Sequence, residues 1–221
     1  IVPCGTTGES PTLDHEEHGR VIQIVVEAAK GKVPIIAGAG SNSTKHAIEL
    51  TRQAADLGAD ASLHVPPYYN KPTQEGLYRH FSAIAKAVDL PLIAYNIQGR
   101  TAVNIETSTL ARLAKEHSNI VGVKEASGNI PQMMDVINEL PKDFAVISGD
   151  DNLALPLMAL GGKGVISVAS NIIPKEMHEL CEHALNGSFE KARQMHYELL
   201  PLFKGIFIET NPIPIKAALA M

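Results

Sequence analysis

The stretch Ile120-Val-Gly-Val-Lys124 is an apolar run that ends on a charged residue, and it shows how the whole chain is organised. Six similar runs, rich in Val and Ile, occur along the sequence, and each is followed by a loop and a helical pattern. Runs that are apolar throughout are typical of parallel strands buried on both faces. The seven predicted strands are Ile1–Cys4, Val33–Ala37, Ala61–Val65, Leu92–Tyr95, Ile120–Lys124, Phe144–Ser148 and Gly164–Val168.

The segments between the predicted strands have the start signals of amphipathic helices. Asp14-His-Glu-Glu17 has the pattern of a capping box, Asn42 or Ser43 can cap the next helix, and Thr73 can cap the one after it. Alternation of strands and helices implies right-handed crossovers and a parallel sheet.

A closed barrel and an open doubly wound sheet both fit this alternation. The units repeat at roughly 20 to 33 residues, close to the average of a (β/α)₈ barrel. Polar residues also follow nearly every predicted strand, whereas an open sheet gathers them at one switch point. We therefore predict an α/β fold, a (β/α)₈ TIM barrel with a C-terminal helical appendage, and keep the doubly wound sheet as the alternative.

The domain prediction follows from the count of strands. With seven runs counted, we expect the first barrel strand to precede Ile1, and the chain to be a fragment that lacks this strand and its C-terminal end. Residues 1–187 are predicted to form the barrel and residues 188–221 the start of a helical region.

Composition restricts the possible partners. Of the 221 residues, 45% are hydrophobic and 19% are charged, and the net charge of −5 comes without any basic run, so nucleic acid is not an expected partner. No apolar stretch approaches the ~20 residues that cross a bilayer, so no membrane partner is expected. Cys4 and Cys181 are too few for a disulfide framework, and a reducing cytoplasm is the expected compartment.

Lys124 is the first candidate for chemistry. A strand would place this lysine inside the barrel mouth, where desolvation disfavours the ammonium form and lowers its pKa. A neutral amine can attack a carbonyl and then hold the product as an iminium electron sink. The structural alternative is a lysine that leaves the strand end and pairs with a carboxylate such as Glu125.

Other strand ends supply groups that bind carboxylates. The loop Gly5-Thr-Thr-Gly-Glu9 offers two hydroxyls and free amides, although such loops often only turn the chain. Arg100, five residues after Tyr95, can grip a carboxylate through two parallel hydrogen bonds or form a surface salt bridge. Asp150 and Asp151 follow the sixth strand and could equally cap the next helix.

An amine, several phenols and hydroxyls, and an arginine at one barrel face suit carbon–carbon bond formation by a keto acid through an enamine. Hydride and phosphoryl transfer are disfavoured, because Gly38-Ala-Gly40 lacks the rest of a dinucleotide fingerprint and no Gly-Lys-Ser/Thr loop is present.

An ordered set of motifs resembles the 4-hydroxy-tetrahydrodipicolinate synthase (dihydrodipicolinate synthase) family of the class I aldolase and N-acetylneuraminate lyase superfamily. The resemblance runs from end to end of the chain. The motifs are Gly5-Thr-Thr-Gly-Glu-Ser10, Pro67-Tyr-Tyr-Asn70, Tyr95-Asn with Arg100-Thr101, Gly122-Val-Lys-Glu-Ala126, Ser148-Gly-Asp-Asp151, Gly164-Val-Ile-Ser167 and Asn211-Pro-Ile-Pro-Ile-Lys216.

The resemblance implies a lyase of lysine and diaminopimelate biosynthesis. Lys124 would form a covalent imine with pyruvate, with no other cofactor and no metal, and the enamine would attack L-aspartate 4-semialdehyde. The family also implies roles for other residues. These are a proton relay of Thr6, Tyr69 and Tyr95, and substrate binding by Thr7, Arg100, Gly149 and Ile166.

The resemblance further implies a homo-oligomer, a dimer of dimers, in which Tyr69 reaches the neighbouring subunit's site. It implies an allosteric lysine pocket formed by Ser10, His15, His18, Asn42 and Tyr68. Two positions depart from the family. Gln98 replaces the usual proline near Arg100, and His46 replaces the glutamate of feedback-regulated members, which leaves inhibition by lysine open.

Two other functions fit part of the pattern. N-acetylneuraminate lyase and 2-keto-3-deoxy-sugar aldolases share the Schiff-base lysine and the tyrosine, but Arg100 and the Tyr68-Tyr69 pair favour the dipicolinate branch. A non-catalytic keto-acid sensor predicts the loss of Lys124, Tyr95 or Thr6, and all three are present.

Overall fold

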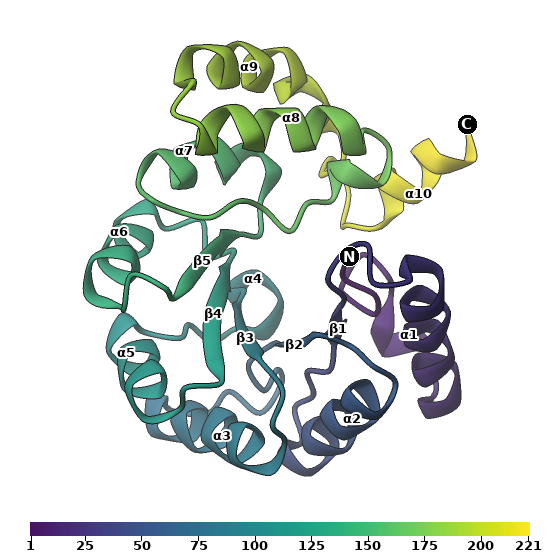
Figure 1. Ribbon diagram of the computed structural model, residues 1–221, viewed down its shortest axis with the longest axis vertical. Helices are drawn as coiled ribbons and strands as arrows, with labels where there is room; N and C mark the ends of the chain where they lie inside the picture. The colour runs from purple at the N-terminus through teal and green to yellow at the C-terminus, as the bar shows by residue number, and fades with distance from the viewer.

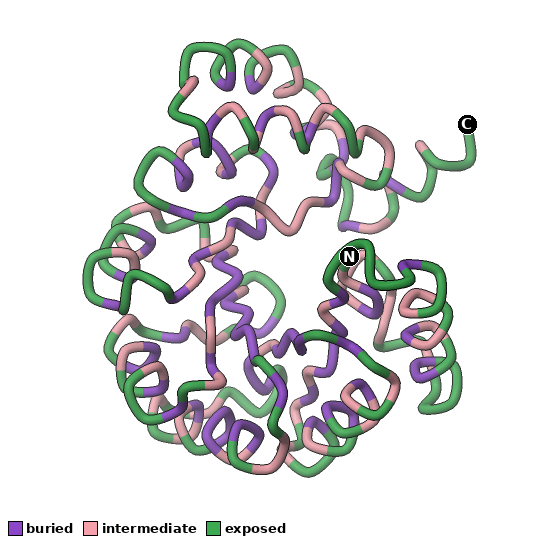
Figure 2. Tube along the Cα trace, in the orientation of Figure 1, coloured by how far each residue is buried: buried purple, intermediate pink, exposed green.

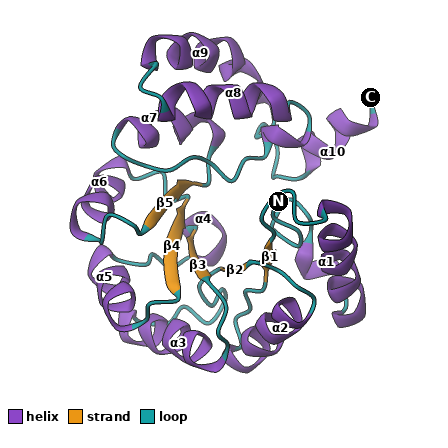
Figure 3. Ribbon diagram, viewed as in Figure 1, coloured by secondary structure: helices purple, strands orange, loops and turns teal.

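The computed structural model describes residues 1–221 and contains one parallel sheet whose strands neighbour one another in chain order, β1-β2-β3-β4-β5. Figures 1 and 3 show the strands at the centre with the helices around them. An order without reversal is that of a (β/α) barrel, so the barrel prediction is confirmed and the doubly wound alternative is wrong. The strands are β1 (Ile36–Gly38), β2 (Ala61–His64), β3 (Leu92–Asn96), β4 (Ile120–Glu125) and β5 (Ala145–Ser148).

Helices connect and follow these strands. The long ones are α1 (His15–Ala29), α2 (Thr44–Asp56), α3 (Gln74–Ala87), α5 (Thr107–Glu116), α6 (Ile130–Glu139), α8 (Pro174–Leu185) and α9 (Phe189–Gly205). The short ones are α4 (Gln98–Thr101), α7 (Ala154–Ala159), α10 (Ile213–Ala220) and three 3₁₀ turns, η1 (Ser10–Thr12), η2 (Asp151–Leu153) and η3 (Ala169–Asn171). None of them is both long enough and apolar enough to cross a bilayer.

The first predicted strand lies beside β1 without being a regular strand. The Ile36 amide donates to the Ile1 carbonyl, and the Gly38 amide donates to the Pro3 carbonyl, each at 2.9 Å. The two backbones approach so closely that a Cβ at Gly38 would clash with the carbonyl oxygen of Cys4, so glycine is required there.

The seventh predicted strand is likewise reduced to a short parallel contact with β5. The Ser148 amide donates to the Gly164 carbonyl and the Ile166 amide donates to the Ser148 carbonyl, each at 2.9 Å, around a single bridge between Ser148 and Val165. Gly164 has a φ of 144°, which disfavours a longer regular strand.

The helix starts follow the predicted caps. The Asp14 carboxylate accepts from the Glu17 amide at 2.9 Å, and the Glu17 carboxylate accepts from the Asp14 amide at 3.0 Å, so the capping box of α1 is complete. Of the two candidates for α2 the cap is Ser43, whose hydroxyl accepts from the His46 amide, and Thr73 caps α3.

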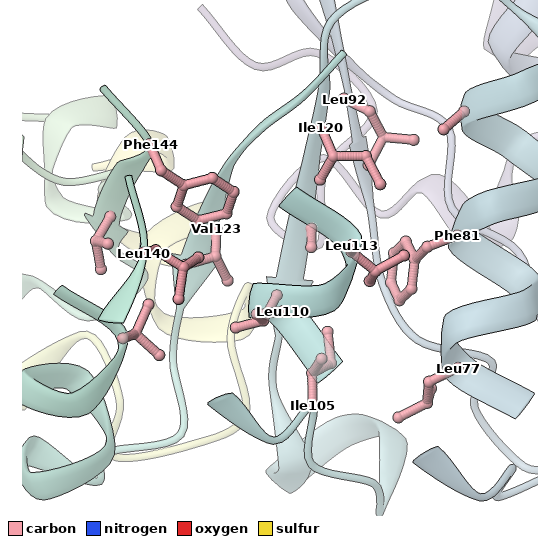
Figure 4. Close-up of a cluster of buried hydrophobic side chains, with 14 of the residues drawn as sticks. Leu77, Phe81, Leu92, Ile105, Leu110, Leu113, Ile120, Val123, Leu140 and Phe144 are labelled. Carbon is pink, nitrogen blue, oxygen red and sulfur yellow. The ribbon is translucent and has the colours of Figure 1, made fainter. Parts of the chain in front are cut away.

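Most of the core lies between the strands and the surrounding helices. Leu92 and Ile120 point outward from β3 and β4 and pack with Phe81 and Leu113 of the neighbouring helices (Figure 4). In Figure 2 the central strands are mostly buried and the outer helix faces are exposed. This packing fixes the strand ends that support the site, because close-packed interiors transmit small shifts.

A second hydrophobic cluster joins α7, α8, α9 and α10. Met158, Leu180, Phe203 and Ile215 come from these four helices and are all buried in it. The run of helices after the last strand is as predicted. The proposed domain boundary near residue 187 stays a prediction, and α9 shares its core with α8 on the other side of that boundary.

Candidate active site

The strand register brings Lys124 and Tyr95 together at the carboxyl ends of β3 and β4. Tyr95 pairs with Lys124, and Lys124 pairs with Ile147 of β5. The Lys124 Nζ lies 4.0 Å from the centroid of the Tyr95 ring. Strand ends at this side of the barrel are where enzymes of this fold hold their reactive groups.

The Lys124 amine is buried without an ion pair. The residue is only 8% exposed, and burial lowers the pKa of its amine to about 8, although the nearby Asp150 and Asp151 oppose this shift. No salt bridge of the chain includes Lys124. About a tenth of the amine is therefore uncharged at pH 7, far more than for an exposed lysine, and the free amine is the form that attacks a carbonyl.

Glu125 does not neutralise Lys124, and the alternative that paired the two is wrong. Successive residues of a strand point to opposite faces, and Glu125 points outward into a buried polar network. Its carboxylate accepts from the Asn96 side-chain amide at 3.1 Å and from the Ser127 backbone amide at 2.8 Å.

Gly149 makes room for the Lys124 side chain. A Cβ at this position would lie 3.0 Å from Lys124 Cε and 2.6 Å from the Cβ of Ala126. Ile166 packs against the inner cluster that contains Tyr95. Gly149 therefore lies beside Lys124 and Ile166 beside Tyr95, where the resemblance predicted them.

The Tyr95 phenol is also buried, and its surroundings adjust its acidity. Burial raises the pKa of Tyr95 to about 12, while the Thr6 side chain and the positive charge of Arg100 act in the opposite direction. Tyr95 therefore keeps its proton at neutral pH and can donate it to a leaving oxygen.

A cavity of about 550 Å³ joins the barrel mouth to the N-terminal helices. Its lining includes Thr6, Tyr95 and Arg100 at the mouth, and Ser10, His15, His18 and Tyr68 farther out. The cavity therefore brings together two of the four predicted catalytic residues and four of the five predicted allosteric residues. The predicted residues outside the lining are Lys124, Thr7, Gly149, Ile166, Tyr69 and Asn42.

Asn211 connects two of the predicted substrate-binding groups. Its side-chain amide donates to the Thr7 hydroxyl oxygen at 3.0 Å, and its backbone carbonyl accepts from the Arg100 guanidinium at 2.7 Å. Sequence reasoning gave Asn211 no role, although the motif that begins with it was part of the resemblance.

Tyr69 stands apart from these groups within the single chain. It is 89% exposed with a left-handed φ of 67°, and Tyr68 beside it is 38% exposed. The next residue, Asn70, ties the loop to the segment just before α2 by donating to the Asn42 carbonyl at 2.9 Å. This loop therefore presents two phenols at the surface.

The histidines lie at the outer end of the cavity. One His18 ring nitrogen bonds to the Gly38 carbonyl at 2.8 Å, and burial lowers the pKa of His18. His46 faces Glu49 at 3.5 Å, and the rings of His15 and His46 lie 6.3 Å apart. No group of three metal-binding side chains is arranged to hold an ion.

The Asp151 carboxylate binds one hydroxyl and two backbone amides and does not line the cavity. Its carboxylate accepts from the Ser167 hydroxyl at 2.5 Å and from the amides of Val168 and Ala169 at 3.1 Å each. The capping alternative is wrong, because neither aspartate makes a side-chain cap bond to η2 or α7. Asp151 instead fixes the loop that follows Ile166. The charges of both Asp150 and Asp151 oppose the lowering of the Lys124 pKa by burial.

The fold and the site together define a (β/α)-barrel enzyme with a buried lysine amine at its strand ends. The family model described as the dihydrodipicolinate synthetase family matches residues 1–221, and the chain belongs to that family.

Curated relatives resemble the chain over its whole length. The 4-hydroxy-tetrahydrodipicolinate synthase of Syntrophobacter fumaroxidans is 59% identical over 221 residues, which are 100% of this chain and 76% of the relative. The synthase of Methanocaldococcus jannaschii is 58% identical over the same shares of both chains.

Solved structures agree with the fold. Dihydrodipicolinate synthase from Aquifex aeolicus matches with a TM-score of 0.99 and 53% identity over 100% of this chain and 75% of its own. The chloride-inhibited synthase of Acinetobacter baumannii, solved with pyruvate, matches with a TM-score of 0.97 and 52% identity. The synthase of Cyanidioschyzon merolae, solved with lysine bound, matches with a TM-score of 0.97 and 48% identity. Each covers 100% of this chain and 75% of the solved one.

Proposed function

We propose that the protein is a 4-hydroxy-tetrahydrodipicolinate synthase that condenses pyruvate with L-aspartate 4-semialdehyde in lysine and diaminopimelate biosynthesis. The observation that supports this most is the Lys124 amine, buried without an ion pair and next to Tyr95 at the strand ends. Family membership and the names of the relatives support the choice of substrates.

The reaction begins at the Lys124 amine, which attacks the keto carbon of pyruvate. Loss of water gives an iminium, and loss of a methyl proton gives an enamine. The enamine carbon then attacks the aldehyde carbon of the second substrate and forms the new carbon–carbon bond. The substrate's own amine finally displaces Lys124 from the iminium carbon, which closes the ring and regenerates the enzyme.

The surrounding side chains have separate tasks in this proposal. Tyr95 moves protons during formation of the iminium, as its retained proton and its contact with Lys124 allow. The full assignment is a relay of Thr6, Tyr95 and Tyr69, carboxylate binding by Thr7 and Arg100, and lining of the Lys124 pocket by Gly149 and Ile166.

We further propose that the active unit is a homo-oligomer, a dimer of dimers, in which Tyr69 completes the relay of a neighbouring subunit. Its exposure of 89% leaves the phenol free to reach another chain. Both cysteines are free, which fits the reducing cytoplasm that we propose as the compartment.

Ser10, His15, His18, Asn42 and Tyr68 are proposed to bind lysine as an effector. His46 faces this cavity where regulated members carry glutamate, so an ammonium lacks one acidic partner. We expect His46→Glu to lower the lysine concentration for half-inhibition about tenfold, since a charged hydrogen bond is worth ~1.5 kcal/mol. Titration of the initial rate with lysine measures this, and no response in either protein at millimolar lysine contradicts the effector site.

Borohydride reduction of the protein with pyruvate, followed by peptide mass mapping, tests the main proposal. We expect a reduced pyruvate adduct on the peptide that contains Lys124. No adduct there would reject the chemistry. Turnover with N-acetylneuraminate in place of the semialdehyde would instead favour the sister lyase, which shares Lys124 and Tyr95.

A further inference from the structure

Asn211 lies in the turn between α9 and α10, far in sequence from the strands, yet its side chain is buried at the barrel mouth. It is only 5% exposed and borders the same cavity as Tyr95 and Arg100. Its two hydrogen bonds reach Thr7 and Arg100, the groups to which we assign the carboxylates of the two substrates.

We propose that Asn211 is a positioning residue that fixes the direction of the Thr7 hydroxyl for the pyruvate carboxylate, an inference that rests on the proposed function. A hydroxyl has one proton to donate and can also accept. Because the Asn211 amide donates to the Thr7 oxygen at 3.0 Å, the Thr7 proton stays available for another acceptor. A carboxylate can only accept, so this arrangement favours it.

Arg100 is held by the same residue in a different way. Its Nη2 donates to the Asn211 backbone carbonyl at 2.7 Å, and the other guanidinium donors remain for a substrate carboxylate. A change of the Asn211 side chain keeps the backbone carbonyl and removes only the bond to Thr7. The two substrates should therefore respond differently to the same substitution.

The test compares Asn211→Ala with Asn211→Asp in the whole protein. Alanine removes the donor to Thr7, and we expect the pyruvate concentration for half-maximal borohydride-trapped adduct to rise about fivefold. The KM for the semialdehyde should stay within about twofold, because a change that leaves the Arg100 bond in place affects binding little. Equal rises for both substrates overturn the proposal.

Aspartate has the shape of asparagine and the opposite hydrogen-bonding role. It accepts the Thr7 proton and brings a negative charge toward the pyruvate carboxylate, so we expect an effect of about fiftyfold or more on pyruvate. A purely structural role predicts the reverse order, since aspartate disturbs packing less than alanine. An alanine effect equal to or larger than the aspartate effect overturns the proposal.

Asn119 is a matched control away from the mouth, because its side-chain amide donates to the carbonyls of Ala85 and Val88. We expect Asn119→Ala and Asn119→Asp to leave pyruvate binding unchanged. If Asn211→Asp does not fold, the double variant with Thr7→Val decides. Once Thr7→Val is present, Asn211→Ala should add less than a twofold change, and an additive effect overturns the proposal.

These outcomes separate the inference from the proposed function. A wild-type protein that forms no adduct on Lys124 rejects the function itself. A wild-type protein that forms the adduct, together with Asn211 variants that bind pyruvate normally, rejects only the role of Asn211.

Discussion

The inner and outer faces of the same two strand ends hold opposite kinds of polar site. On the inner face, Tyr95 and Lys124 touch one another, and the amine has no carboxylate partner. One residue farther along each strand, Asn96 and Glu125 point outward and form a saturated network. In that network Gln132 donates to the Glu125 carboxylate at 3.4 Å, and Asn96 accepts from the Ile105 amide at 3.0 Å.

The difference shows how one barrel leaves one buried polar group without partners and surrounds another with donors. Glu125 is fully buried, yet donors surround its carboxylate, so the network fastens β3 and β4 to α6. Lys124 is nearly as buried but lacks such partners, so burial acts on its pKa. The amine has no partner to offset its burial, so its pKa falls. The carboxylate has several donors around it, so its surroundings are rigid.

The largest expected effect comes from Lys124→Met, which keeps the bulk of the side chain and removes the amine. We expect no trapped adduct and a fall in turnover of roughly 10³-fold or more, because the covalent route is lost. The variant should also unfold at a higher temperature, because a buried amine that no longer needs desolvation stops opposing folding. Lys142→Met, at an exposed loop position, is the control. A Lys124→Met protein that still turns over excludes this lysine as the nucleophile.

Glu125→Ala tests the outer face and should lower the stability of the fold while leaving adduct formation on Lys124 intact. Removing the carboxylate leaves the donors of Asn96, Gln132 and Ser127 without this partner, and we expect a loss of ~2–4 kcal/mol in the free energy of unfolding. At low temperature the folded fraction should still trap pyruvate, with the adduct on Lys124. Denaturant unfolding and trapping on the same samples measure both effects. A stable but inactive Glu125→Ala protein would mean that the two faces are not separate.

The pH dependence of adduct formation sharpens the contrast further. Burial lowers the pKa of Lys124 to about 8, so the initial trapping rate at low pyruvate should rise as pH increases toward 8 and level off above it. The folded pKa lies below the ordinary value of 10.5, so the unfolded chain binds more protons between about 8 and 10.5. Lys124 should therefore oppose folding below pH 8 and cease to do so as pH rises through that window. A trapping midpoint near the ordinary pKa of lysine would show that the inner face does not desolvate the amine.

Much of this contrast could be predicted from local sequence patterns. The strand runs located Lys124 and Tyr95, and the capping residues Asp14, Ser43 and Thr73 begin their helices as short-range chemistry requires. The outward direction of Glu125 also follows from the two-residue period of a strand. The alternative that paired Glu125 with Lys124 is inconsistent with this period.

Long-range contacts could not be predicted in the same way. Asn211 lies 111 residues from Arg100 and 204 from Thr7, and no periodicity links them. The two edge segments near Ile1 and Val165 were predicted as strands from composition, but regular pairing depends on neighbours and backbone angles that a local pattern does not contain. The site is therefore predictable where it follows strand ends and not where a distant turn completes it.

The smallest expected effect concerns Gln98, beside the inner face, where the family usually has proline. Gln98 is the first residue of α4, and its amide makes no backbone hydrogen bond, so proline can replace it without breaking the helix. Gln98→Pro restricts φ two residues before Arg100, and we expect the KM for the semialdehyde to change about two- to threefold, since a loop with fewer conformations loses less freedom on binding. The KM for pyruvate should stay nearly constant, because no hydrogen bond links Lys124 or Thr7 to this helix. Steady-state kinetics with each substrate varied in turn measures both constants. Equal changes in both would mean that the inner face responds as one unit, and that Arg100 and Lys124 are not separately positioned.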